Sequence, residues 1–117
     1  MPAVSSPITT HVLDTAKGRP AAGVPITISI EDNGQWTLLG QGVTNSDGRV
    51  SNLIPADKPL KKARYLMHFD TQTYFHEQRI QGFYPYVEIV FEIRDLLDHY
   101  HVPLLLSPFG FSTYRGS

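Results

Sequence analysis

The chain has 117 residues and no cysteine, and its 10 Lys and Arg residues nearly balance its 11 Asp and Glu residues. This length predicts one domain over residues 1–117, with a flexible N-terminal extension at residues 1–6. The missing cysteines exclude disulfides and thiolate metal ligands, and the balanced charge leaves no electrostatic footprint for nucleic acid or an anionic membrane as partner.

The sequence contains no apolar run near the roughly 20 residues that a membrane helix requires. Its first residues also lack the charged and apolar regions of a secretory signal. We therefore expect a cytoplasmic protein. A periplasmic protein whose leader had been removed would look the same.

The first half of the chain alternates β-branched or apolar residues with polar ones, which predicts strands. These runs are residues 8–14, 24–32 and 35–44. The connection before the second run is rich in Gly and Pro and predicts turns. Asn33-Gly34 favours a type I′ hairpin turn, because both central positions of that turn need positive φ. In the first run, alternation places His11 on the face opposite Val12.

A predicted turn at residues 45–48 leads into Arg49, and further alternating runs follow. These later strands are predicted at residues 61–70, 86–93 and 99–107 and in the segment after Gly110. Residues 71–81 have the helical pattern of about two turns, with Thr71 as the expected N-cap. Pro103 cannot donate to a ladder, so it favours an edge strand or a strand paired on one side only at that point. Seven or eight short strands predict an all-β fold, a two-sheet antiparallel sandwich.

Three polar residues interrupt otherwise apolar or hydroxyl-bearing strands, namely His11, Arg49 and His101. Each has a structural interpretation as well as a chemical one: a strand histidine can simply be partly buried, and Arg49 can form a surface ion pair with Asp47 or a glutamate. His99 and His101 lie on the face opposite the apolar residues of their strand. Their spacing without a third close ligand is weak evidence for zinc, so we expect no metal. The motifs of serine hydrolases, zincins and nucleotide enzymes are absent.

Three separated motifs occur in the order ITTHVLDTAKGRPA, SDGR and HYHVPLLLSPFGFSTYRGS, and together they span most of the chain. This combination resembles the 5-hydroxyisourate hydrolases, the transthyretin-related enzymes of urate breakdown. The resemblance implies a transthyretin-like sandwich of two four-stranded sheets with one short helix. It also implies a homotetramer, a dimer of dimers with the sites in a central channel, and no cofactor.

The same resemblance implies which residues form the site. The catalytic residues would be His11, Arg49 and His101, with His11 and Arg49 also contacting substrate, and His99 in a supporting role. The substrate-binding tail would be Tyr114, Arg115, Gly116 and Ser117.

The expected reaction is hydrolysis of a cyclic amide in 5-hydroxyisourate, giving 2-oxo-4-hydroxy-4-carboxy-5-ureidoimidazoline. His101 suits the base that activates water, with His11 orienting. Arg49 suits the developing oxyanion, because its guanidinium is always charged and donates two hydrogen bonds. Replacing Arg49 with Ala should therefore cost more rate than stability, whereas Phe91→Ala should open a core cavity.

Two other classes of protein remain open at this point. A transthyretin-like carrier would bind an aromatic small molecule in its tetramer channel without converting it. A purely structural domain would leave the two histidines and the arginine scattered. The discriminating observation is whether these side chains converge, because an apolar channel has little use for imidazoles and a guanidinium.

Overall fold

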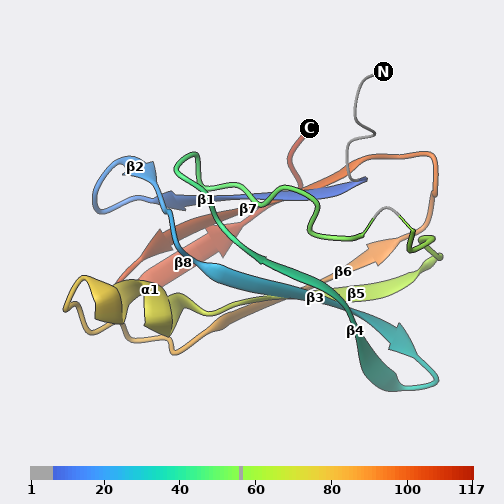
Figure 1. Cartoon of the computed structure of the whole chain (residues 1–117), viewed down its shortest axis with the longest axis horizontal. Coiled ribbons are helices and arrows are strands. Elements are labelled where there is room, and N and C mark those ends of the chain that lie inside the picture. The colour runs from blue at the N-terminus through green and yellow to red at the C-terminus, as the bar shows by residue number, and fades with distance from the viewer. Residues whose placement is uncertain (1–6, 56) are drawn as a thin grey trace.

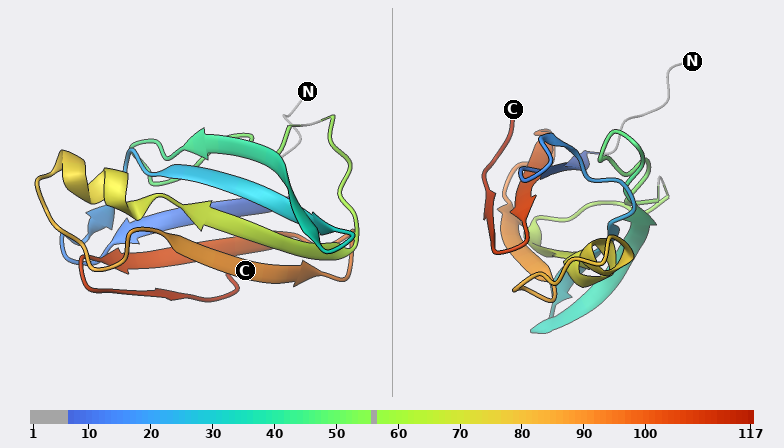
Figure 2. Two further views of the ribbon diagram at one scale, coloured as in Figure 1. Left: turned by 90° about the horizontal axis from the view of Figure 1, so that it is seen from below. Right: turned by 90° about the vertical axis from the view of Figure 1, so that its left-hand side faces the viewer.

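The computed structural model describes residues 7–55 and 57–117, which form two packed sheets and a short helix at one end (Figures 1 and 2). The first sheet has the order β2-β1-β7-β8, and the second has the order β4-β3-β5-β6. The first contains β1 (Ile8–Asp14), β2 (Arg19–Pro20), β7 (Tyr100–Ser107) and β8 (Gly110–Thr113). The second contains β3 (Pro25–Asp32), β4 (Gln35–Val43), β5 (Ala63–Phe69) and β6 (Val87–Ile93). The predicted sandwich of two four-stranded sheets is confirmed, whereas the predicted extension at residues 1–6 lies outside the described residues.

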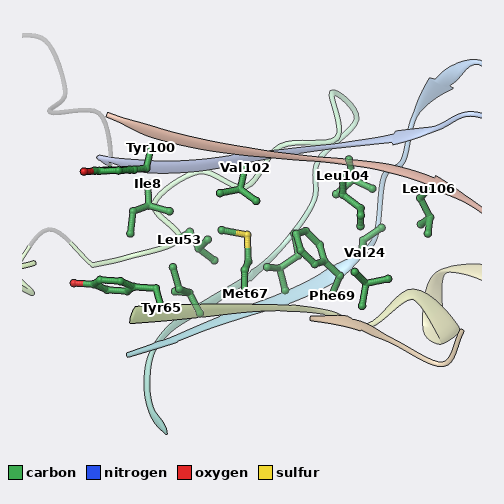
Figure 3. Packing of buried hydrophobic residues seen from close by; sticks show 14 of the residues in the cluster. Ile8, Val24, Leu53, Tyr65, Met67, Phe69, Tyr100, Val102, Leu104 and Leu106 are labelled. Atoms are coloured by element: carbon green, nitrogen blue, oxygen red, sulfur yellow. The ribbon is translucent and has the colours of Figure 1, made fainter. Parts of the chain in front are cut away.

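The core lies between the two sheets, where every second residue of the inner strands points inward (Figure 3). Ile8 from β1 lies across the core from Tyr65 of β5, and Leu104 from β7 lies across from Phe69 of β5; all four are fully buried (Figure 3). Leu53, in the connection between the 45–48 turn and β5, also enters this core. Phe91 differs from the expectation, because it is only partly buried and stacks at the margin against Tyr65, with ring centroids 5.9 Å apart. Phe69, not Phe91, is therefore the residue whose truncation would open a core cavity.

One strand pair departs from the antiparallel arrangement, because β1 and β7 run parallel. The chain travels through the whole second sheet between them, so no hairpin fixes their relative direction. Their register places Thr9 opposite His101 and His11 opposite Pro103. The ladder of β7 with β8 covers Leu104 to Ser107, so at Pro103 the strand is paired with β1 alone. Of the two predictions for Pro103, the strand paired on one side only is the one observed.

The Asn33-Gly34 hairpin turn is confirmed, with φ of 52° and 77° at the two residues. The two-residue strand β2 lies within the segment predicted as a turn-rich connector, and it was missed because a strand of that length carries no periodicity. It pairs with the last residues of β1 and extends the first sheet.

The helix α1 (Thr71–Glu77) is shorter than the predicted segment 71–81. Its N-cap is Asp70, not Thr71, because the Asp70 carboxylate accepts from the Thr73 amide at 3.1 Å and the Thr73 hydroxyl at 2.7 Å. The Tyr74 hydroxyl donates to the buried Asp14 carboxylate at 2.7 Å, which ties α1 to the end of β1. Burial and then this carboxylate raise the pKa of Tyr74 to about 12. No helix in the described part of the chain is long and apolar enough to span a membrane.

Candidate active site

The outer face of the first sheet gathers the two histidines that the sequence singled out. On β1 the buried residues alternate with Thr9, His11 and Leu13, so His11 points away from the core. On β7 the same alternation turns His101 outward. Thr9 lies directly opposite His101 in the parallel register, which puts His11 and His101 on neighbouring strands of one face. Both imidazoles are half-buried.

Arg49 reaches this face because the preceding turn folds back against β1. The Asn45 side-chain oxygen accepts from the amides of Asp47 at 2.9 Å and Arg49 at 3.1 Å, which closes the predicted turn. Arg49 then pairs with His11 in an antiparallel bridge. None of the ion pairs within the described residues includes Arg49, so the predicted alternative of a surface pair with Asp47 or a glutamate is wrong.

Gly48 permits this close approach of the turn to β1. Its φ is 74°, and a Cβ there would collide with the Val12 carbonyl oxygen and come within 3.2 Å of the His11 ring. The Gly48 carbonyl instead accepts from the Val12 amide at 2.9 Å. A glycine is thus required immediately before the arginine that shares the face with His11.

The electrostatic environment of His101 favours its neutral form. Burial lowers the pKa of His101 below its ordinary value, and the positive charge of Arg49 lowers it further. The neighbouring imidazoles of His11 and His99 act in the same direction, while hydrogen bonding at Thr9 opposes them. His101 is therefore mostly neutral at pH 7 and able to accept a proton.

The C-terminal segment continues alongside β7 beyond β8 (Figure 1). The Gly116 amide donates to the His101 carbonyl at 2.9 Å, in the same register that pairs Thr113 with Leu104. A Cβ on Gly116 would lie 2.5 Å from the His101 ring, so this imidazole packs directly on the glycine. Gly116 therefore belongs to the same outer face as His101.

The other tail residues do not all converge on that face. Arg115 turns to the opposite side, where its guanidinium lies 4.7 Å from the centroid of the Tyr100 ring and 3.4 Å from the His99 carbonyl oxygen. Its contact with Asp98 is 3.5 Å. The structure thus places Arg115 as an anchor of the tail, away from the imidazoles. Tyr114 and Ser117 are both exposed.

Thr9 is the site residue that the sequence analysis did not single out. Its hydroxyl oxygen lies 2.8 Å from His101 Nδ1 and 3.2 Å from His99 Nε2. Alternation along β1 puts Thr9 on the same face as His11, but its contact with His101 depends on the parallel pairing of β1 with β7. No local pattern in the sequence reports that pairing.

A hollow of about 200 Å³ opens beside the tail, between the margins of the two sheets. Its walls are mostly apolar and include Phe91, Val102 and Tyr114. Within the described residues, no group of three His, Asp or Glu side chains is placed to hold a metal ion. His101, Glu92 and Arg115 also line this hollow, so it borders the residues of the tail and His101.

A two-sheet sandwich with this topology and two imidazoles beside a guanidinium on one face defines a transthyretin-like domain with a polar site. The sequence matches the HIUase/Transthyretin family over residues 8–116. It is 48% identical over 110 residues to a probable 5-hydroxyisourate hydrolase of Caenorhabditis elegans, covering 94% of this chain and 81% of that protein. It is 47% identical over 115 residues to the 5-hydroxyisourate hydrolase of Mus musculus, covering 97% of both. The chain therefore belongs to the HIUase/Transthyretin family, and the family predicted from its motifs is confirmed.

Solved structures agree with this assignment. The structure of Klebsiella pneumoniae 5-hydroxyisourate hydrolase is 35% identical, with a TM-score of 0.81 over 94% of this chain and 97% of that one. Sea bream transthyretin in complex with thyroxine is 33% identical, with a TM-score of 0.88 over 95% of both chains. The fold is thus shared by a hydrolase and by a protein solved in complex with thyroxine.

Proposed function

We propose that this chain hydrolyses 5-hydroxyisourate to 2-oxo-4-hydroxy-4-carboxy-5-ureidoimidazoline in urate degradation. The similarity to named hydrolases over nearly the whole chain agrees with the activity predicted from the motifs. The observation that carries the proposal is the convergence of His11, Arg49 and His101 on one outer face. A structural domain would give no reason for this arrangement.

The chemistry follows from the charge state of each group. Neutral His101 accepts a proton from water, and the resulting hydroxide adds to the carbonyl carbon of the cyclic amide. Arg49, which has no carboxylate partner among the described residues, donates hydrogen bonds to the oxyanion that forms. The ring C–N bond then breaks, and the leaving nitrogen takes the proton that His101 accepted from water. His11, beside Arg49, orients the substrate for this step.

The carrier function has one specific argument in its favour, which is the likeness to the sea bream transthyretin structure with thyroxine. A carrier for an apolar aromatic molecule gains from an apolar lining. On this face an unpaired guanidinium and a half-buried imidazole would instead have to be desolvated against the ligand, at a cost in binding free energy. The polar site therefore favours hydrolysis over transport.

Self-association into a homotetramer, a dimer of dimers, is part of this proposal. The strands β6 and β8 are the terminal strands of their sheets, and each offers unpaired backbone groups to another chain. An exposed aromatic cluster lies near α1, formed by Phe83, Tyr84, Phe109 and Phe111. The Tyr84 ring contacts Phe83 at 4.9 Å and Phe111 at 5.2 Å between centroids. Exposed apolar clusters of this kind are typical of protein interfaces.

The deciding experiment follows the decay of freshly generated 5-hydroxyisourate by ultraviolet absorbance. Wild-type protein should accelerate the decay, and His101→Asn should remove about 10²- to 10⁴-fold of that acceleration. His76→Asn, which changes an exposed histidine on α1, is the matched control and should behave as wild type. Decay at the spontaneous rate with wild-type protein would contradict the hydrolase function and leave the carrier.

A further inference from the structure

The Thr9 hydroxyl lies between two imidazoles with different surroundings. Its oxygen is 2.8 Å from Nδ1 of the half-buried His101 and 3.2 Å from Nε2 of the exposed His99. His99 precedes β7 by one residue and lies two positions from His101, so both rings project from the same outer face. The parallel register then brings Thr9 of β1 alongside both rings.

A hydroxyl carries one proton, so it donates to one neighbour and accepts from the other. In one arrangement Thr9 donates to His101 Nδ1, which leaves the proton of the neutral His101 ring on Nε2. In the other, His101 Nδ1–H donates to Thr9, and Thr9 donates to His99 Nε2. Only the second arrangement leaves a lone pair on His101 Nε2, the nitrogen that Thr9 does not contact.

We propose that Thr9 is a positioning residue that holds His101 in the Nδ1–H tautomer and relays a proton from His101 to His99. This inference rests on the proposed hydrolysis and specifies how its base is prepared. Thr9 itself does not touch the substrate, because its oxygen is occupied by the two imidazoles. The role resembles that of a carboxylate that fixes the tautomer of a catalytic histidine, with a hydroxyl in its place.

The relay balances in atoms and charge. Water transfers a proton to His101 Nε2, and the hydroxide so formed adds to the substrate carbonyl. The Nδ1 proton of His101 passes to the Thr9 oxygen, and the original Thr9 proton passes to His99 Nε2. His101 ends neutral with its proton on Nε2, Thr9 is unchanged, and His99 carries the positive charge.

The distribution of charge around the two rings gives this transfer its direction. His101 is approached by Arg49 from the turn, by His11 from β1 and by His99 from its own strand, and the Arg49 charge disfavours a second cation there. His99 is exposed, so water solvates its imidazolium. Arg115 contacts the His99 carbonyl but directs its charge toward Asp98. Burial and the Arg49 charge therefore disfavour keeping the proton on His101.

The test compares Thr9→Val, which keeps the β-branched shape without the hydroxyl, with Thr9→Ser, which keeps the hydroxyl. Nitrogen-15 spectra of the imidazoles report the His101 tautomer, and ring-opening kinetics report kcat and KM. Thr9→Val should move His101 toward the Nε2–H tautomer and lower kcat about 10- to 100-fold, the usual loss when a partner that orients an active-site ligand is removed. KM should change little, and Thr9→Ser should restore both readouts.

Thr27→Val is the matched control, because Thr27 on β3 stands opposite His68 on β5 in the second sheet. It should leave the His101 spectrum and kcat unchanged. If the relay ends on His99, then His99→Asn should lower kcat, and adding Thr9→Val should produce no further loss, because residues of one network are not additive.

Three results would overturn the inference. These are an unchanged His101 tautomer in Thr9→Val, an unchanged kcat in that variant, and losses that multiply in the double variant. Failure of the hydrolysis itself is distinguishable, because wild-type protein would then leave 5-hydroxyisourate at its spontaneous rate. The tautomer spectra would still show whether Thr9 fixes the His101 ring, since they require no turnover.

Discussion

Arg49 and His101 are linked through charge, and this link gives the site a defined pH dependence. Burial and the Arg49 guanidinium lower the pKa of His101 below its ordinary value of 6.5. The folded protein therefore binds fewer protons at this ring than the unfolded chain does. The stability from His101 is present above pH 6.5 and is lost as the pH falls through the lower pKa of the folded state. A base with a lowered pKa stays competent into mildly acidic solution.

Replacing Arg49 with Gln tests this link directly. The pKa of His101 should rise toward its ordinary value but stay below it, because burial is the larger cause of the shift. The acid limb of the pH profile of kcat/KM should move to higher pH with it. The rate at neutral pH should also fall about 10²- to 10³-fold from the loss of an oxyanion donor.

Proton NMR titration of the His101 ring measures the pKa of this histidine, and ring-opening rates from pH 5 to 8 measure the acid limb of the kcat/KM profile. Arg64→Gln is the control, since Arg64 pairs with Glu31 at 3.8 Å in the second sheet. An unshifted His101 titration in Arg49→Gln would show that the guanidinium is not near this imidazole in solution.

At the scale of elements, the strands that sequence predicts are those whose own alternation defines them. The runs now called β1, β3, β4, β5, β6 and β7 were located from period-two alternation of residue types, β8 from its aromatic and β-branched residues, and the hairpin turn from Asn33-Gly34. Partner choice between distant strands has no such local signal. The parallel pairing of β1 with β7 and the tiny β2 were therefore outside what alternation can report.

The candidate site divides in the same way. His11, Arg49 and His101 were found because they interrupt otherwise apolar or hydroxyl-bearing strands. Thr9 is a residue type that is common in strands whether or not it has a function. Its contact with His101 therefore became visible only in the fold. Arg115 shared a motif with Gly116, yet successive residues of an extended chain point to opposite sides, and only Gly116 packs on His101. A sequence motif therefore locates a segment, but the alternation of side chains along the extended backbone determines which of them face the site.

The tail acts on the site through Gly116, and a single methyl group tests this. Gly116→Ala would place its Cβ 2.5 Å from the His101 ring, so either the ring or the tail must move. We expect kcat/KM to fall about tenfold or more, since overpacking of this kind costs roughly 1 to 3 kcal/mol. The His101 ring resonances should shift as well.

Gly110→Ala is the matched control in the same tail. Its Cβ would meet only the Ser107 hydroxyl, at an ordinary 3.7 Å, so activity should be retained. Ring-opening kinetics and His101 spectra of both variants provide the comparison. Equal activity of the two variants would mean that close packing of Gly116 against the His101 ring is not required for catalysis.

At the scale of the molecule, the hydrophobic core, the polar site and the exposed aromatic cluster lie in different places. The core lies between the sheets, and the polar site lies on the outer face of the first sheet. The aromatic cluster of Phe83, Tyr84, Phe109 and Phe111 lies near α1, formed by the segment before β6 and by the turn and strand around β8. Because the cluster does not include His11, Arg49 or His101, its residues can be substituted without altering any of these three side chains.

Phe83→Asp tests whether this cluster joins subunits. Phe83 has 69% of its surface exposed, so a carboxylate there leaves the isolated chain folded but would be buried without a partner in an interface. The wild type should have a mass close to four times 13.1 kDa by sedimentation or light scattering, and the variant a smaller one. Leu38→Asp, which charges an exposed residue of β4, should keep the wild-type mass. Circular dichroism checks that the variant is folded, and a folded Phe83→Asp protein with the wild-type mass would place the subunit contact elsewhere.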